Sequence, residues 1–175
     1  IMHLYLLQRW STILLKSTTM NTTSTIDEFM NAAEKFASIS EKICDGWMLV
    51  RHKDLLKSYL RKETFITVGS SLLKAEYIVF YNLSYGVPSF SFNVWNCSGR
   101  LLNLNDVRQM GKDFYSVITQ QEHPIFSRPY FIVHPCHTEA LLAIFKDKTR
   151  NIIVTFLGLI VPLLPQLNLS AEYGM

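Results

Sequence analysis

Hydrophobic residues recur every three or four positions over residues 26–43, which is the spacing of one face of an α-helix. Thr25 and Glu28 have the spacing of a capping box, in which each residue's side chain accepts a hydrogen bond from the other's backbone N–H. Gly46 stands where a left-handed glycine commonly ends a helix. The pattern predicts an amphipathic helix that begins after Thr25 and stops before Gly46. Its apolar face consists of Ile26, Phe29, Met30, Ala33, Phe36, Ala37 and Ile43.

After Gly46 the period changes to two. Four short segments are rich in aromatic and β-branched residues and are separated by polar residues, Gly or Pro, which is typical of strands. Because consecutive strands with short connections usually lie side by side, we expect a four-stranded antiparallel meander. The segments are WMLVRH from Trp47, TFITV from Thr64, AEYIVFYN from Ala75 and SFSFNVW from Ser89.

The rest of the chain mixes helical and extended patterns. Asn103 or Asn105 is placed to cap a helix with an apolar side. The segment YFIV, residues 130–133, predicts a short strand that leads to His134. Together with the meander, this order predicts the α+β class, with C-terminal helices. The helical apolar positions are Val107, Met110, Phe114 and Val117, and further helices are expected from Thr138 to Phe145 and from about Thr149 to Val161.

The chain has 175 residues, 49% of them hydrophobic, which suits one core. Residues 1–19 lack an acidic residue, and we interpret them as an extension, disordered or an artefact of the gene model. Residues 20–175 are expected to form a single domain. The apolar run 152–164 contains Pro162 and is shorter than the ~20 residues of a membrane span, so we expect no transmembrane segment.

The formal net charge is +3, and the basic residues are scattered, so we expect no nucleic-acid partner. The three cysteines, Cys44, Cys97 and Cys136, are odd in number and widely spaced. We therefore expect no disulfide framework, and we expect the protein to be in a reducing compartment.

The segment YFIVHPCHT, residues 130–138, raises the question of what Cys136 does. Free cysteines are often buried and inert, but two flanking histidines would need polar partners in a dry core. A metal site is a second interpretation, although the spacing of the four candidate ligand residues matches no usual zinc-binding pattern. A third is a nucleophile at a strand exit, just before a helix N-terminus that favours a thiolate. The four candidate metal ligands are His123, His134, Cys136 and His137.

The block ITQQEHPIFSRPYFIVHPCHT, residues 118–138, closely resembles the active-site region of the autophagy-related protein ten family. Members are E2-like enzymes that carry a ubiquitin-like protein as a thioester. Three further segments are similar to the family: CDGWMLVRHKD from Cys44, EYIVFYNLSYGVPSFSF from Glu76 and GRLLNLNDV from Gly99. The resemblance implies an E2-like fold over roughly residues 26–170.

For the site, the resemblance implies that Cys136 forms the glycyl thioester. Ordinary ubiquitin-conjugating enzymes place a His-Pro-Asn several residues before their cysteine, whereas here His-Pro directly precedes Cys136. Another residue must then stabilise the oxyanion. His134 is the first candidate, with a purely structural role as its alternative, and His137 and Asn93 are weaker candidates. Tyr77 and Tyr81 are interpreted mainly as core residues.

The resemblance also implies partners and a location. The modifier would be autophagy-related protein twelve, the E1-like activating enzyme protein seven and the target protein five, in the cytoplasm and with no cofactor. An exposed strand edge, for example Ser89–Trp95, could pair with a partner strand, and the sequence does not identify which edge this is. Two alternatives stay open: a catalytically inert adaptor of the same fold, and a Cys–His hydrolase with His52 or His123 as the distant base.

Overall fold

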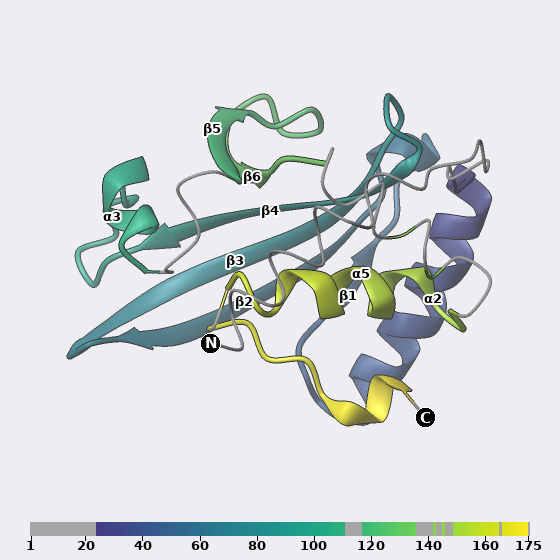
Figure 1. The fold of residues 1–175 in the computed structure, drawn as a ribbon, viewed down its shortest axis with the longest axis horizontal. Helices are drawn as coiled ribbons and strands as arrows, with labels where there is room; N and C mark the ends of the chain where they lie inside the picture. Colours follow the sequence, from purple (N-terminus) through teal and green to yellow (C-terminus); the bar gives the residue numbers. More distant parts are fainter. Residues whose placement is uncertain are drawn as a thin grey trace, which may run out of the picture.

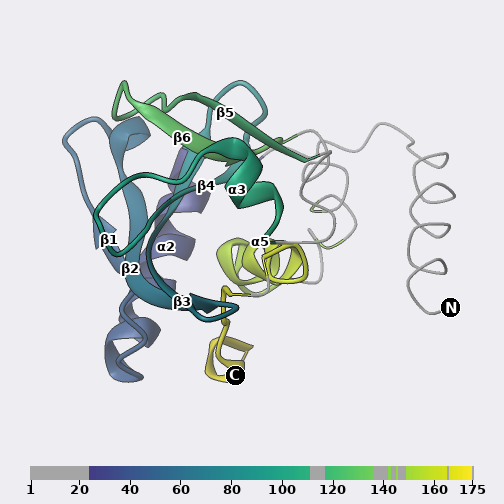
Figure 2. The ribbon, with the colours of Figure 1, turned by 90° about the vertical axis from the view of Figure 1, so that its left-hand side faces the viewer.

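The computed structural model describes residues 24–110, 117–135, 142, 145, 149–164 and 166–174. In this part of the chain, one face of a six-stranded antiparallel sheet is covered by helices α2 (Ile26–Lys42) and α5 (Ile152–Ile160), as Figures 1 and 2 show. The α+β class is confirmed, and the arrangement agrees with the E2-like fold that the resemblance implies. The predicted extension 1–19 lies outside the described residues.

The beginning of α2 is as predicted. The backbone N–H of Glu28 donates to the hydroxyl of Thr25 at 3.1 Å, and the N–H of Thr25 donates to the Glu28 carboxylate at 2.8 Å. Both bonds of the capping box are therefore present. Asp27 and Glu28 also place negative charge in the first turn, where it is favourable.

The end of α2 differs from the prediction for Gly46. The helix ends at Lys42, and the left-handed residue that follows its cap is Cys44, with φ of 53°. The N–H of Asp45 donates to the carbonyl of Ser40, as in a Schellman motif. The hydrogen bonds of this motif offset the roughly 1–2 kcal/mol that a left-handed conformation costs a residue with a Cβ.

The predicted meander is confirmed. Its strands are β1 (Met48–Val50), β2 (Tyr59–Val68), β3 (Ser71–Asn82) and β4 (Val87–Trp95), and a short 3₁₀ helix, η2 (Leu55–Lys57), lies between β1 and β2. Strand β2 begins before the predicted Thr64, because Arg61 and Lys62 are charged residues that find acidic partners within the fold. The apolar pattern did not reveal this first part of β2, because its residues include charged ones.

The sheet continues beyond the meander in the order β1-β2-β3-β4-β6-β5. Strand β6 (Pro129–Val133) is the predicted short strand, but β5 (Ile118–Glu122) was not predicted. Strand β5 pairs with β6 alone among the described strands, and four of its five residues are exposed, so it has no apolar alternation. This polar character hid it from the sequence pattern.

The helix predicted after Asn103 is confirmed at its beginning, but it does not include Val117. Helix α3 covers Leu104–Arg108, and Val117 lies in a turn before β5. The cap is confirmed at Asn103, whose side chain accepts from the N–H of Asp106 at 3.0 Å. The predicted Phe114 lies outside the described residues.

The segment Ser89–Trp95, considered above as an example of a partner-binding edge, is not at an edge of the sheet. Strand β4 lies inside the sheet, between β3 and β6, with Ser91 opposite Ile132 on the β6 side. The strands at the two edges of the described sheet are β1 and β5. The alternation of residue types in 89–95 shows which side chains point to each face of the sheet. It gives no information about which strands lie beside β4.

The C-terminal region packs on α2. Helix α5 starts slightly later than expected, because Asn151 is its N-cap and accepts from the N–H of Ile153 at 2.9 Å. A final 3₁₀ turn, η4 (Ala171–Gly174), places Tyr173 in a stack on Phe36 with ring centroids 4.2 Å apart. Of the helix predicted from Thr138, the structure describes Leu142 and Phe145 and leaves the other residues undescribed.

The sheet has a hydrophobic cluster on each face. The large one joins α2 and α5 to the sheet, and its fully buried members include Phe29, Phe90 and Phe156. The small one lies on the other face, beneath the loop 123–128, and consists of Ile78, Phe80, Tyr130 and Ile132. The sheet is therefore buried on both faces near β6.

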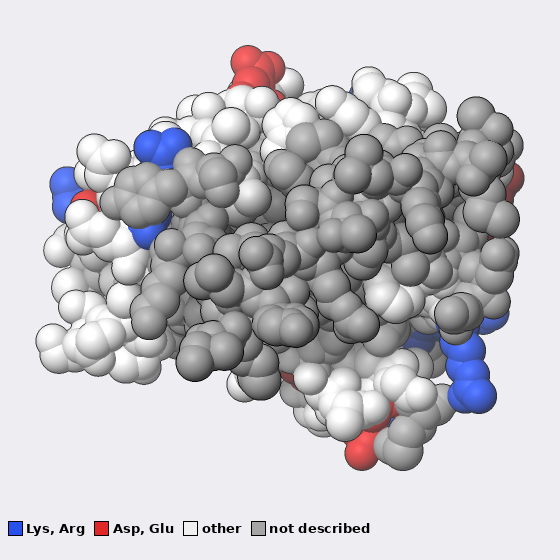
Figure 3. Space-filling view, in the orientation of Figure 1, with Lys and Arg blue, Asp and Glu red and all other residues white. Residues whose placement is uncertain are grey.

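The described basic side chains do not gather in one place. On the face that Figure 3 shows, basic side chains are visible near the left edge and at the lower right, with acidic side chains near some of them. Several pair with acids, as in the contacts of Arg51 with Glu34 and of Lys62 with Asp45. Among the described helices, none is long and apolar enough to cross a membrane.

Candidate functional site

The β5–β6 hairpin delivers the chain to the predicted site. Four consecutive β6 residues from Tyr130 are buried, and the N–H of His134 extends the pairing by donating to the carbonyl of Val117 at 2.9 Å. Pro135 is buried, whereas the side chain of His134 is exposed. The position of His134 is thus set by a buried strand, and its imidazole is accessible. Cys136 and His137 lie outside the described residues.

The ring of His134 faces Tyr85, a residue of the β3–β4 turn. The two ring centroids are 6.2 Å apart, with the planes at 77°. Tyr85 is half-buried and packs against the large core. No signal in the sequence singled out Tyr85, because the contact joins residues 49 positions apart and depends on how β4 and β6 pair.

The β3–β4 turn is fixed to the residue that precedes the α2 cap. The carbonyl of Gly86 accepts from both the N–H and the hydroxyl of Ser24, at 2.7 and 3.0 Å. The hydroxyl of Tyr81 donates to the carbonyl of Ser24 at 2.7 Å. Within the turn, Asn82 accepts from the N–H of Tyr85 at 3.3 Å. These bonds hold the backbone of Tyr85 from two sides, and they give the predicted core residue Tyr81 a hydrogen-bonding role at the rim.

His123 lies in the small core. It is fully buried, and its ring packs beside Phe80 and Tyr130 with centroids 4.6 and 4.9 Å away. Its Nδ1 accepts from the N–H of Ile125 at 3.1 Å. Burial, with a smaller contribution from the charge of Arg128, lowers the pKa of His123 to about 4. The residue is therefore a neutral anchor of the loop 123–128 at neutral pH.

His52 has a local role in the β1–β2 connection. Its Nδ1 accepts from the N–H of Asp54 at 3.0 Å, and its own N–H donates to the hydroxyl of Ser58. Both histidines proposed as a distant base thus accept a backbone hydrogen bond through Nδ1. The ring of His134 instead lies beside that of Tyr85.

Asn93 lies beside the far end of β6. Its amide donates to the carbonyl of Pro129 at 3.0 Å. Because Ser91 is opposite Ile132, the register puts Asn93 near Tyr130, four residues before His134 and about 13 Å along the strand. The second tyrosine considered, Tyr77, is 1% exposed and belongs to the large core, and burial raises the pKa of its hydroxyl.

A buried carboxylate, Glu76, lies opposite Asn93 in the β3–β4 pairing and was not predicted. Glu76 is 4% exposed, and it accepts from Arg61 Nε at 2.7 Å and from the Tyr130 hydroxyl at 2.6 Å. The alternating polar and apolar residues of KAEYIVF do place Glu76 on the opposite face from Tyr77. A second hydrophobic layer over that face was the part that the sequence pattern did not reveal.

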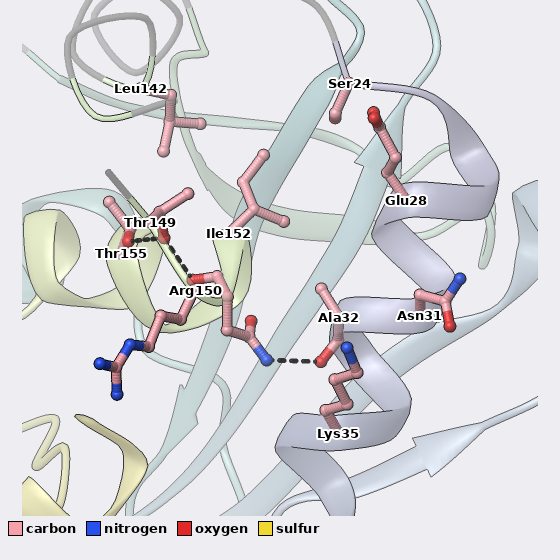
Figure 4. Close-up of a pocket in the computed structure, with 11 residues that line it drawn as sticks. Ser24, Glu28, Asn31, Ala32, Lys35, Leu142, Thr149, Arg150, Ile152 and Thr155 are labelled. Carbon is pink, nitrogen blue, oxygen red and sulfur yellow. Dashed lines mark hydrogen bonds between the residues drawn. The ribbon is translucent and has the colours of Figure 1, made fainter. Parts of the chain in front are cut away.

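A hollow of about 360 Å³ lies between the beginnings of α2 and α5. Figure 4 shows the lining residues Ala32 and Lys35 on α2 and, across the hollow, Thr149 ahead of α5 and Ile152 at its beginning. Across its floor, the amide of Asn151 donates to the carbonyl of Ala32 at 2.9 Å. This bond couples the two helices on the face of the sheet that they share.

The described residues contain no group of three or more His, Cys, Asp and Glu side chains placed to hold a metal ion. Cys44 and Cys97 are free and exposed. They provide accessible thiols in other parts of the molecule than the β6 exit, so they are natural controls for Cys136.

Comparison with known proteins bears on the whole domain. The model of the family described as "Autophagocytosis associated protein, active-site domain" matches residues 5–170. The chain is 35% identical over 121 residues to the Homo sapiens protein named ubiquitin-like-conjugating enzyme ATG10, a match that covers 61% of this chain and 54% of that protein. The Arabidopsis thaliana protein of the same name is 27% identical over 127 residues, which cover 66% and 56% of the two chains.

A third relative of that name, from Pichia angusta, is 23% identical over 110 residues, covering 53% of this chain and 74% of its own. The chain spans about half the length of the human and Arabidopsis relatives. The names of all three relatives agree with the resemblance seen in residues 118–138. The chain belongs to the family of autophagocytosis-associated active-site domains, among the relatives named ATG10.

Proposed function

We propose that the chain is an E2-like enzyme of autophagy that carries a ubiquitin-like modifier as a thioester on Cys136. The observation that carries the proposal is the exit of buried strand β6, where an exposed His134 stands two residues before Cys136 inside the family's active-site domain. Such a strand end holds the backbone of His134 and Pro135, which directly precede Cys136 in the chain.

Two reactions follow. First, the Cys136 thiolate attacks the carbonyl carbon of the thioester between the modifier's C-terminal glycine and an E1-like activating enzyme, whose thiolate leaves. The exchange of one thioester for another is nearly balanced in energy, so Cys136 needs accessibility more than an extreme pKa. The proposed modifier is autophagy-related protein twelve, and the proposed activating enzyme is protein seven.

Second, a lysine amine of the target attacks the new thioester. The tetrahedral intermediate carries a negative oxygen, the Cys136 thiolate then leaves as the amide forms, and the attacking nitrogen loses its proton to solvent. A hydrogen-bond donor aimed at that oxygen stabilises the intermediate. We assign this task to His134, with His137 as a second candidate, and we give Asn93 no step because its amide donates to Pro129. The proposed target is autophagy-related protein five, in the cytoplasm, and the chain needs no cofactor.

The decisive experiment mixes the purified chain with activating enzyme, modifier and ATP, and compares gels with and without thiol reductant. The wild type is expected to form an adduct that reductant removes. Cys136→Ser should form an oxyester that resists reductant, because a serine ester is not cleaved by thiols. Cys136→Ala should form neither.

Cys44→Ser and Cys97→Ser are the matched controls, since both thiols are exposed and both variants should keep the reductant-sensitive adduct. A wild type that never acquires an adduct would overturn the proposal that the chain is a conjugating enzyme. An adduct that persists in Cys136→Ala would move the carrier to another residue.

A further inference from the structure

The loop 123–128 lies over the small hydrophobic cluster and is closed at its base by two backbone hydrogen bonds. The N–H of Ser127 donates to the carbonyl of His123, and the N–H of His123 donates to the carbonyl of Arg128, both at 2.9 Å. Ser127 has a φ of 51°, a left-handed conformation that residues with a side chain seldom adopt. The loop is therefore a small closed unit that its own hydrogen bonds hold together.

Ring contacts attach this loop to the sheet. His123 packs beside Phe80 of β3, with ring centroids 4.6 Å apart, and Phe126 packs edge to face on Tyr59 of β2 at 4.9 Å. Since β4 lies between β6 and β3, the loop reaches from the beginning of β6 across β4 to β3 and β2. Side chains thus hold the loop on the face of the sheet opposite α2 and α5.

The closed loop requires a neutral His123. Its Nδ1 accepts from the N–H of Ile125 at 3.1 Å, and a protonated imidazole has no lone pair for this bond. The ring is fully buried and its neighbour Arg128 is positive, so burial and charge both disfavour a further positive charge. Closure of the loop and protonation of the ring therefore oppose each other.

The charged groups around the loop do not remove this conflict. The carboxylate of Glu76 already pairs with Arg61 at 2.7 Å and with Arg128 at 3.9 Å, so two cations share its charge. Glu122 is exposed, and solvent screens its charge. The titratable and charged groups on the elements packed around His123 are Glu122 on β5, Arg128 in the loop, Tyr130 on β6, Glu76 on β3, and Tyr59 and Arg61 on β2.

The layer beneath the closed loop contains buried polar atoms. In the part of the chain that the structure describes, Ser89 Oγ and Ser91 Oγ on β4 and Nε2 of His123 are buried without a hydrogen-bond partner. Ser89 lies opposite Phe80 and Ser91 opposite Ile132, so both hydroxyls belong to the face that the loop covers. Opening of the loop would give these atoms water as a partner, which offsets part of the apolar contact that is lost.

We propose that the loop 123–128 is an acid-sensitive cover, which opens while the rest of the sheet stays folded and which is released when His123 is protonated. In the open loop the ring titrates as an ordinary histidine with a pKa near 6.5, whereas burial in the closed loop lowers the pKa to about 4. With these two values, the ratio of open to closed loop rises about 20-fold as the pH falls from 7 to 5. Opening uncovers the apolar small cluster, and the inference is independent of the proposed function.

Hydrogen exchange of the folded wild-type protein tests whether the loop opens by itself. The amides of Ile125 and Ser127 report on the loop, and the amides of β3, which is paired on both sides, report on the core. At low denaturant concentration, exchange in the loop should be insensitive to denaturant, because local opening exposes little surface, whereas exchange in β3 should accelerate. Loop amides that follow the denaturant dependence of β3 would overturn the proposal.

The same measurement at two pH values tests the release by acid. After correction for intrinsic exchange rates, the protection of Ile125 and Ser127 should fall about 20-fold between pH 7 and pH 5 in the wild type. Equal protection at both pH values would overturn the proposal. Both wild-type measurements remain decisive if a variant fails to fold.

His123→Gln identifies the titrating group, because glutamine has no titrating ring. The protection of the loop amides in this variant should fall less than about twofold between the two pH values. His52→Gln is the matched control, since Nδ1 of His52 also accepts a backbone N–H, from Asp54 at 3.0 Å, but His52 is exposed. The control should keep the wild-type fall. An equal fall in wild type and His123→Gln would refute the release by His123.

Discussion

The hydroxyl of Tyr130 on β6 donates to Glu76 on β3 at 2.6 Å, and the bond crosses over strand β4 that lies between them. Glu76 also accepts from Arg61 on β2 at 2.7 Å, so a single buried carboxylate links β2, β3 and β6. Burial is the main reason that the pKa of the Tyr130 hydroxyl is raised, with the Glu76 charge adding to it. The Tyr130 hydroxyl therefore keeps its proton and stays a donor, and the network holds the strand that leads to His134.

Removing the charge of Glu76 is predicted to destabilise the fold. Glu76→Gln keeps the size of the side chain but leaves Arg61 facing a neutral partner, and we expect a loss of about 2–3 kcal/mol in the free energy of unfolding. Denaturant unfolding measures this loss directly. Glu63→Gln is the matched control, because Glu63 also pairs with Arg61 but is exposed. Its loss should stay below about 1 kcal/mol, and equal losses in both variants would contradict the importance of burial.

His134→Ala is predicted to separate the two steps of the proposed reaction. If its imidazole stabilises the oxyanion, discharge of the thioester onto lysine should slow by about 10²–10³-fold. Folding should change little, because the His134 side chain is exposed and its N–H bond to Val117 comes from the backbone. Thermal unfolding provides that control. A discharge rate within about threefold of wild type would leave His134 with a purely structural role, given the same expected magnitude.

The free energy of unfolding is predicted to decrease as the pH is lowered, because of His123. The folded state lowers its pKa from 6.5 to about 4, so the unfolded chain binds the proton first. The contribution is fully present above pH 6.5 and is lost as pH falls from 6.5 toward 4, by up to about 3 kcal/mol.

The His123 prediction is checked by comparing denaturant unfolding at pH 7 and pH 5 in wild type and in His123→Gln, which has no titrating ring. The variant should be less stable at pH 7 and should lose less stability between the two pH values. Phe80, Phe126 and Tyr130 surround the ring, and the charged neighbour is Arg128. Identical pH dependence in the two proteins would assign the acid sensitivity to the carboxylates.

Local sequence signals predicted the parts of the fold that depend on neighbours in the chain. The capping box at Thr25 needs residues three positions apart, and it formed as predicted. The cap at Asn103 was one of two predicted positions, and its pairing with Asp106 as a second capping box was not predicted. The four strands of the meander followed from period-two alternation. Strand β5 was not predicted, because it is a strand only through its pairing with β6, and the paired residues lie about ten positions apart across a loop. Nothing in its own polar residues distinguishes such an edge strand from a turn.

The site shows the same division. The segment ending in His134 and Cys136 was visible as a strand that runs into reactive residue types, whereas Tyr85 was not. Its contact with His134 exists because β4 inserts between β3 and β6, and the β3–β4 turn then comes to the end of β6. Sequence spacing carries no record of that insertion, so the contact between Tyr85 and His134 emerges from the structure alone.

The docking of the C-terminal turn on α2 is predicted to contribute to stability through Tyr173. Its ring stacks on Phe36 at 4.2 Å, and its hydroxyl donates to Asp45 at 2.7 Å, a carboxylate that also pairs with Lys62. Tyr173→Phe removes the hydrogen bond and should cost about 1–2 kcal/mol, whereas Tyr173→Ala also removes the buried ring and should cost about 3–5 kcal/mol. Denaturant unfolding of both variants separates the two contributions. If the alanine variant is no less stable than the phenylalanine variant, the ring stack does not hold the C-terminal turn in place.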